Sequence, residues 1–184
     1  MVYRINIAGL ERDLPLCPIS DKIYIGAFVL FGDIELTEHC ARELYKKAPE
    51  HDVMITAESK GIPLICDMCR ISGKNRYVLA RKSIKLYMKD VVSCETKSIT
   101  TGAMQTLYID GDDAEYLKGK RVLIVDDVIS TGGSLKSLEN LVLQSGGEIV
   151  GKMAILAEGD ATTREDIIYL QKLPLFDAEG NPIN

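Results

Sequence analysis

Residues 121–134 read Arg-Val-Leu-Ile-Val-Asp-Asp-Val-Ile-Ser-Thr-Gly-Gly-Ser. The four consecutive apolar β-formers predict a buried strand, and the small residues that follow predict a turn that opens a helix. Such a turn brings backbone N–H groups, hydroxyls and a helix N-terminus together, which suits a phosphate dianion. We therefore predict a phosphate-binding loop made of Ser130, Thr131, Gly132, Gly133 and Ser134.

Two adjacent carboxylates, Asp126 and Asp127, lie directly before this predicted loop. They are not phosphate ligands, because like charges repel, but they are placed to accept hydrogen bonds from sugar hydroxyls. A strand that ends in an ordinary helix-capping aspartate would explain one carboxylate and not the whole run. A Walker phosphate loop is excluded, because no Gly-Lys-Ser or Gly-Lys-Thr follows a glycine and four variable residues.

The rest of the chain alternates helical and β-type patterns. Apolar residues recur at helical spacing between Leu36 and Tyr45, and a β-type run follows at residues 52–57. We further expect strands at residues 76–80, 105–109, 121–125 and 149–157, and helices at about 63–71, 133–144 and 162–170, the last capped by Thr162 or Thr163. This alternation predicts an α/β fold with a mainly parallel sheet flanked by helices, whose ligands bind beyond the carboxyl ends of the strands.

The composition indicates one globular domain over residues 1–184. Hydrophobic residues make up 46% and charged residues 27%, and no stretch approaches the roughly 20 apolar residues that span a bilayer. Charges interrupt the apolar residues of the first 13 positions, unlike a secretory signal, so we expect a cytoplasmic protein without a membrane partner. The net charge of −5 argues against nucleic acid as the main ligand.

Five cysteines form an odd set outside a small secreted domain, which favours reduced thiols over a disulfide framework. Cys66 and Cys69 have the spacing of a redox or metal pair. They lie in an apolar run without a second pair, however, and neither His39 nor His51 shows ligand spacing. We therefore expect ordinary buried or surface thiols, and the role of the pair stays open.

Residues 122–134 resemble the diphosphate-sugar signature of the type I phosphoribosyltransferases, in which two acidic residues and a Thr-Gly-rich loop follow a hydrophobic strand. The resemblance extends from about Phe28 to Leu175. It implies 5-phosphoribosyl-1-diphosphate as substrate, with its ribose on Asp126 and Asp127 and its 5-phosphate in the predicted loop. It also implies a small hood at residues 1–35 that helps to bind the base, beside an α/β core at residues 36–175.

The run Thr56-Ala-Glu-Ser-Lys-Gly61 resembles the diphosphate loop of the adenine-type branch. The resemblance assigns the diphosphate to Ala57, Glu58, Ser59, Lys60 and Gly61. That branch often carries a non-proline cis peptide in this loop, which would here join Glu58 to Ser59. Taken without the family context, the run is equally compatible with a plain turn.

The run Arg81-Lys-Ser-Ile-Lys-Leu86 resembles a basic segment that meets the diphosphate in adenine-type enzymes, sometimes from the neighbouring subunit. The resemblance implies catalytic roles for Lys60, Arg81, Lys82 and Lys85, and a homodimer. An exposed basic cluster is the alternative. In the family a mobile hood follows, which would be residues 88–106 here and would exclude water from the reaction; a twisted β-hairpin is compatible with the same residues.

The base is less well defined by the sequence. The run Ala27-Phe-Val-Leu-Phe-Gly-Asp-Ile34 resembles the Phe-Arg-Asp-Ile region of adenine-specific enzymes, but Gly32 replaces the arginine. Residues 97–102 look closer to archaeal-type hypoxanthine or guanine relatives. We therefore expect a purine without choosing which one. The candidate base contacts are Val29, Leu30 and Glu158. Alternatively, the valine and leucine are ordinary core residues and the glutamate caps a following helix.

The resemblance implies Mg²⁺ as cofactor, which we expect to be held mainly by substrate and water with no direct protein ligand. Two other functions stay open. A regulator that senses the diphosphate sugar without catalysis would need a DNA-binding domain, and about 35 residues before the first αβ unit are too few for one. An enzyme for a non-purine base such as orotate is the other; uracil-type segments are not evident.

Overall fold

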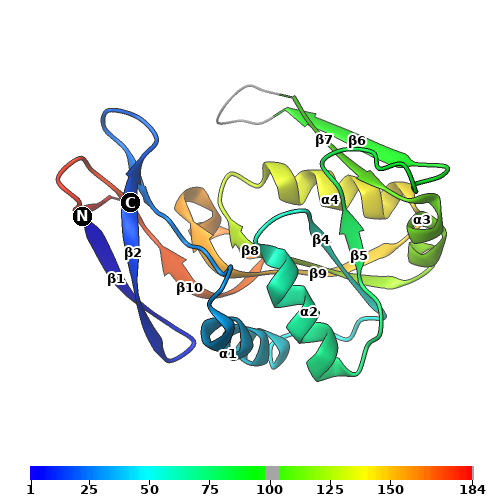
Figure 1. The fold of residues 1–184 in the computed structure, drawn as a ribbon, viewed down its shortest axis with the longest axis horizontal. Coiled ribbons are helices and arrows are strands. Elements are labelled where there is room, and N and C mark those ends of the chain that lie inside the picture. The colour runs from blue at the N-terminus through cyan, green and yellow to red at the C-terminus, as the bar shows by residue number, and fades with distance from the viewer. Residues whose placement is uncertain (98–103, 184) are drawn as a thin grey trace.

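The computed structural model describes residues 1–97 and 104–183, and its centre is a five-stranded parallel sheet (Figure 1). The strand order is β10-β9-β8-β4-β5, and every neighbouring pair runs parallel. The predicted α/β class with a mainly parallel sheet is confirmed. The strands are β4 (Val53–Ala57), β5 (Val78–Ala80), β8 (Arg121–Ile129), β9 (Glu148–Glu158) and β10 (Ile168–Leu173).

Helices cover both faces of this sheet (Figure 1). Along the central strand β8, Leu123 and Val125 pack toward α1 and α2, whereas Val122 and Ile124 pack toward α4. Successive side chains of a strand point to opposite faces, so a strand buried on both faces must be apolar throughout. The helical elements are α1 (Ile34–Tyr45), α2 (Gly61–Ser72), α3 (Gly111–Leu117), α4 (Gly133–Gln144) and the 3-10 turn η1 (Gly159–Thr163).

A second, antiparallel sheet is built from both ends of the chain. Its order is β1-β2-β3-β11-β12, so two C-terminal strands complete a sheet that the N-terminal strands begin. Arg12 of β2 ties this small sheet to α1, because its Nε lies 2.6 Å from the Oδ2 of Asp33, the N-cap of that helix. The strands are β1 (Val2–Ile7), β2 (Leu10–Pro18), β3 (Tyr24–Gly26), β11 (Leu175–Phe176) and β12 (Pro182–Ile183).

A two-stranded antiparallel ribbon, β6 (Val92–Lys97) and β7 (Met104–Ile109), lies beside α4. Its base is anchored, because Cys94 and Leu107 are buried in the core around α4. The β-hairpin reading of this segment is therefore confirmed for the described strands. The anchored base does not test the predicted mobility of residues 88–106, which stays a prediction, and the tip at residues 98–103 lies outside the described residues.

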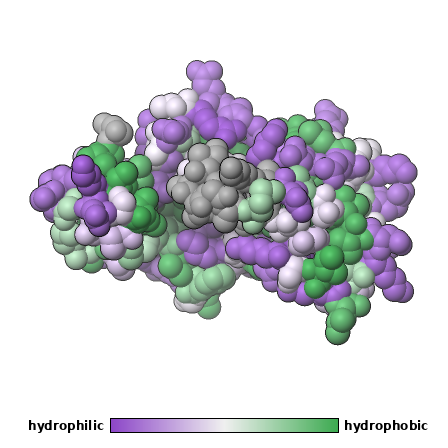
Figure 2. Space-filling view, turned by 90° about the horizontal axis from the view of Figure 1, so that it is seen from above, coloured by the Kyte–Doolittle hydropathy of each residue, from purple (hydrophilic) through white to green (hydrophobic). Residues whose placement is uncertain are grey.

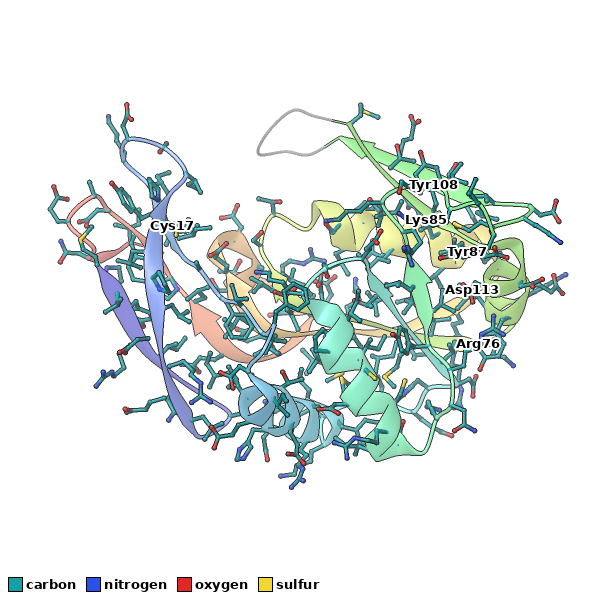
Figure 3. All side chains as sticks on the ribbon, viewed as in Figure 1. Cys17, Arg76, Lys85, Tyr87, Tyr108 and Asp113 are labelled. Carbon is teal, nitrogen blue, oxygen red and sulfur yellow. The ribbon has the colours of Figure 1, made fainter. Side chains whose placement is uncertain are left out.

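Helix α3, between β7 and β8, was not predicted. Asp110 caps it by accepting a hydrogen bond from the backbone N of Asp112. Arg76, just before β5, holds the helix through an ion pair with Asp113 at 2.7 Å, and it lies over the ring of Tyr116 at 4.2 Å (Figure 3). Seven residues with little apolar periodicity give no helical signal in sequence.

The predicted helix at residues 162–170 is wrong. The chain makes the 3-10 turn η1 there and then enters β10, which pairs in parallel with β9. Thr162 does not cap a following helix; its Oγ1 donates to Gly159 O inside the turn. Pairing with a neighbouring strand is a tertiary effect that overrides local propensity.

The cysteines are free in the described structure; Cys17 and Cys66 are exposed, and Cys17 lies on the small sheet. Within residues 1–97 and 104–183, no helix is long and apolar enough to cross a membrane.

Candidate active site

Loops that follow β4 and β8 meet at the carboxyl edge of the sheet, as parallel strands require. The closest approach is at Gly61, the first residue of α2. A Cβ on Gly61 would lie 2.8 Å from the Oγ1 of Thr56 and 3.1 Å from the Oδ1 of Asp126. Only a residue without a side chain lets the predicted diphosphate loop lie this close to the carboxylate pair.

Asp126 and Asp127 belong to β8 itself and are 8% and 4% exposed. The Oδ1 of Asp126 accepts hydrogen bonds from the Oγ of Ser59 at 3.1 Å and from the backbone N of Asp127 at 2.9 Å. Burial, and next the negative charge of Asp127, raise the pKa of Asp126 above its usual range. The pair is thus a buried acidic site whose first member is held by the loop after β4.

Lys60 joins three segments of the site. Its Nζ lies 3.2 Å from the Oδ2 of Asp127 and donates a hydrogen bond of 2.5 Å to the carbonyl oxygen of Phe28. The ammonium lies off the direction that a hydrogen bond to Asp127 requires, so within the described residues this buried Oδ2 has a charge partner and no hydrogen-bond donor. Lys60 therefore offsets the charge of Asp127 while one acceptor of that carboxylate stays free.

The expected cis peptide is not found: no peptide bond in the described part of the chain is cis, so Glu58 and Ser59 are joined by a trans bond. Glu58 connects the diphosphate loop to the basic run instead. Its Oε1 lies 3.2 Å from Arg81 Nη2, and its Oε2 accepts from the backbone N of Lys82 at 3.0 Å. The N–H of Lys82, and then the charge of Arg81, lower the pKa of Glu58.

The other members of the basic run lie further out. Lys82 is exposed, and the Nζ of Lys85 donates to the Oγ of Ser83 at 2.6 Å. Lys85 lies on the same side of the molecule as Tyr108, which belongs to β7 of the ribbon (Figure 3). Arg81 is joined to Tyr108 by backbone hydrogen bonds in both directions. The structure thus brings Arg81 to the diphosphate loop and leaves Lys82 and Lys85 at the surface beside it.

The predicted phosphate loop connects β8 to α4. Gly132 is the N-cap of α4 and has φ of +78°, a left-handed conformation that glycine adopts without strain. No side chain among the described residues caps this helix end. The N-terminus of a helix carries partial positive charge and unpaired N–H groups, so this loop has the chemistry of an anion site.

A cavity of about 270 Å³ lies between the phosphate loop and the small sheet. Val29, Lys60, Ser130 and Glu158 line it, so two of the three candidate base contacts share one cavity with the predicted phosphate and diphosphate loops. Burial raises the pKa of Glu158, and the charge of Lys60 opposes this shift. The remaining lining residues are Ile25, Gly26, Ala27, Phe28, Val128 and Leu173.

Leu30 does not fit its predicted role as a base contact. It is 1% exposed and packs in the core around α1 and α2, whereas its neighbour Val29 is 52% exposed and lines the cavity. The sequence missed Leu173 as a lining residue, because residues 162–170 were taken for a helix and no local signal predicts that β10 pairs with β9. Gly26 was missed as well, since its role depends on the sheet formed by both chain ends.

A protein-family model described as phosphoribosyl transferase domain matches residues 34–179. The chain belongs to the phosphoribosyl transferase family. It is 40% identical to the adenine phosphoribosyltransferase of Thermotoga maritima over 159 residues, which cover 85% of this chain and 88% of that protein. It is also 34% identical to the hypoxanthine/guanine phosphoribosyltransferase of Methanotorris igneus over 145 residues, 78% of this chain and 72% of that protein.

Solved phosphoribosyltransferases share the fold. The adenine phosphoribosyltransferase of Thermoanaerobacter pseudethanolicus superposes with a TM-score of 0.72 at 24% identity, covering 86% of this chain and 95% of that one. The phosphoribosyltransferase fold predicted from residues 122–134 is therefore confirmed.

The described residues contain no group of three or more His, Cys, Asp or Glu side chains that would hold a metal ion by themselves. Two adjacent carboxylates with a free Oδ2 nonetheless fit an ion that keeps most of its ligands as water and substrate oxygens, as Mg²⁺ does. Asp126 and Asp127 are the residues that would contact such an ion or its waters.

Proposed function

We propose that this phosphoribosyltransferase moves the 5-phosphoribosyl group of 5-phosphoribosyl-1-diphosphate onto a nitrogen of a purine base. One observation carries the proposal: the buried Asp126–Asp127 pair lies between an uncapped helix N-terminus and Lys60 of the loop after β4. The diphosphate sugar carries matching groups in the same order: its 5-phosphate suits the helix N-terminus, its ribose hydroxyls suit the carboxylates, and its diphosphate suits the lysine. The relatives named as adenine and hypoxanthine/guanine enzymes support a purine.

The ribose hydroxyls donate to Asp126 and Asp127, and the 5-phosphate accepts from the backbone of the loop that starts at Ser130. The two ends fix the sugar so that its anomeric carbon faces the cavity beside Val29 and Glu158. Positioning of this kind turns a bimolecular reaction into an effectively unimolecular one. It lowers the activation free energy by on the order of 7–11 kcal/mol at best.

In the reaction a base nitrogen attacks the anomeric carbon with its lone pair while the bond from that carbon to the diphosphate oxygen breaks. The diphosphate leaves with the bonding electrons, and the base nitrogen gives up its proton to the departing diphosphate or to water. Lys60 and Arg81, which are paired with Asp127 and Glu58 here, turn to the departing charge. Lys82 and Lys85 add positive charge from the surface.

A bound magnesium ion would neutralise negative charge of the diphosphate sugar. Asp127, through its free Oδ2, and Asp126 are the residues of this chain that would hold the ion or its waters.

Val29 packs on the base, and Glu158 accepts a hydrogen bond from an N–H of its edge. Burial raises the pKa of Glu158, and its carboxylate accepts from any N–H at the edge of a purine. The choice between adenine and the oxo purines is therefore left to the assay.

We also propose a homodimer in the cytoplasm. The segment that follows the basic run exposes large apolar side chains at Ile84, Leu86 and Tyr87. A hydrophobic area is visible at the end of the molecule away from the small sheet (Figure 2). Exposed apolar clusters of this kind support protein–protein contact. A second copy on this surface would bring its own basic run close to the interface.

The test is to incubate the protein with magnesium, the diphosphate sugar and, separately, adenine, hypoxanthine, guanine, xanthine, orotate and uracil, and to measure nucleotide and diphosphate. We expect stoichiometric nucleotide and diphosphate with at least one purine. Product with orotate and no purine would overturn the purine assignment. Binding of the diphosphate sugar without product from any base would favour a sensor.

A further inference from the structure

A charged cluster lies outside the residues assigned so far. It connects α4, β9 and the turn before β10, and its members are Lys136, Glu139, Lys152, Arg164 and Asp166. Lys152 contacts both Glu139, at 2.9 Å, and Asp166. Three cations and two anions leave the cluster with a net charge of +1. Lys152 and Glu139 are 17% and 14% exposed, so these charges are partly shielded from solvent.

Arg164 is the member that reaches the phosphate loop. Its Nε and Nη2 donate to the two carboxylate oxygens of Asp166 at 2.8 and 2.7 Å, which fixes the plane of the guanidinium. A Cβ on Gly132 would lie 3.0 Å from Nη1 of Arg164. Within the described residues Nη1 makes no hydrogen bond, so the nitrogen that Asp166 leaves free is the one against the N-cap of α4.

From this geometry we infer that Arg164 is a further binding residue for the 5-phosphate, held in place by Asp166 and Lys152. The inference rests on the proposed function, because it assigns a ligand to the loop that starts at Ser130. Gly132 lacks the side chain that would separate the guanidinium from the loop.

The physical argument is one of charge and preorganisation. A phosphate dianion at an uncapped helix end is stabilised by backbone N–H groups and by the helix dipole, and an arginine adds a full charge with directed donors. Arginine loses side-chain entropy when it binds an anion, but Asp166 has already ordered this one. Lys152 balances the negative charge of Asp166. The positive charge of Arg164 is therefore not cancelled and attracts the phosphate.

The experiment compares Arg164→Gln with the full-length wild type by calorimetry, using ribose 5-phosphate and inorganic diphosphate as separate probes. We expect ribose 5-phosphate to bind the variant about tenfold more weakly or worse, the range for loss of a charge-assisted hydrogen bond. Diphosphate should bind within about twofold of wild type, since its proposed contacts are Lys60 and Arg81. The matched control is Arg42→Gln, which removes an ion-paired arginine of α1. It should change the affinity for neither ribose 5-phosphate nor diphosphate.

Ribose 5-phosphate affinity within twofold of wild type would overturn the inference, and so would an equal loss for both probes. If Arg164→Gln does not fold, Arg164→Lys and Asp166→Asn decide instead: the lysine should retain part of the affinity, and the asparagine should lower it by freeing the guanidinium. If Asp166→Asn bound ribose 5-phosphate with full affinity and Arg164→Lys did not bind it at all, the proposal that Asp166 orients the charge of Arg164 would be contradicted. A wild type that binds both probes, with no loss in Arg164→Gln, would refute the role of Arg164 alone. A wild type that binds neither probe would refute the proposed function as well.

Discussion

The Nζ of Lys60 lies 3.2 Å from the Oδ2 of Asp127, so a lysine of the proposed diphosphate loop after β4 is paired with a carboxylate of the neighbouring strand β8. The same ammonium holds the carbonyl of Phe28, next to the cavity assigned to the base. A substrate that takes this lysine away from Asp127 would therefore alter the diphosphate, ribose and base parts of the site together.

The double variant Asp126→Asn with Asp127→Asn should bind the diphosphate sugar on the order of 100-fold more weakly, because two acceptors for ribose hydroxyls lose their charge. Calorimetry measures this, and Asp21→Asn on the exposed loop before β3 is the control. Unchanged affinity in the double variant would refute the ribose assignment.

The same carboxylate gives a stability prediction. The pKa of Asp126 is raised in the folded protein, so the folded state holds its proton to higher pH than the unfolded chain does. The free energy of unfolding therefore falls as pH rises above the pKa that Asp126 has in the unfolded chain. It is lowest above the pKa that Asp126 has in the folded protein. Asp126→Asn should therefore raise the melting temperature at pH 8 relative to wild type, and this gain should shrink at pH 4.

Gly132→Val should lower turnover strongly and destabilise the protein. Its φ of +78° is an outlier for a β-branched residue, and the new Cβ would lie 3.0 Å from Arg164 Nη1. A left-handed non-glycine residue costs about 1–2 kcal/mol of unfolding free energy. Urea unfolding and steady-state kinetics are the measurements. Gly133→Ala, which has an ordinary φ and nothing within 4 Å of its new Cβ, should leave the unfolding free energy nearly unchanged.

Glu58→Gln should tighten the binding of inorganic diphosphate. Glu58 now competes for Arg81 at 3.2 Å, and a ligand must displace it. Partly exposed ion pairs contribute up to about 1 kcal/mol, so the gain should reach roughly fivefold at low salt and vanish at high salt. Weaker binding at every salt concentration would mean that Glu58 positions the loop for the ligand rather than competing with it.

His51 should make the protein less stable in mild acid. Its ring is buried, its Nδ1 lies 2.8 Å from Pro49 O, and burial lowers its pKa although the hydrogen bond to Pro49 opposes the shift. The unfolded chain takes up a proton below about pH 6.5, and the folded protein takes it up only at lower pH. Stability is therefore full above that pH and is lost as pH falls toward the folded pKa. Urea midpoints at pH 7.5 and 5.5 should differ less in His51→Phe than in wild type; an equal difference would exclude His51 as the cause.

The sequence by itself predicted the start of β8, the turn after it and both boundaries of α4. It ended the strand at residue 125, whereas β8 continues through Asp126 and Asp127 to Ile129. The unit from β8 to α4 is local: apolar residues on both faces of β8, the glycine at left-handed φ and the helix that follows are all encoded within residues 121–144. The order of the diphosphate loop and basic run along the chain was equally readable, because each follows its own strand.

Only the tertiary structure decided which of these residues touch. Strand β10 forms because β9 offers it a partner, and the small sheet is completed by strands from the far end of the chain. Three features depend on residues that are far apart in the sequence: the burial of Leu30 beside an exposed Val29, the pairing of Lys60 with Asp127, and the approach of Arg164 to Gly132. Such contacts are fixed by packing and strand pairing across the whole chain, and local patterns of hydrophobicity and propensity carry no record of them.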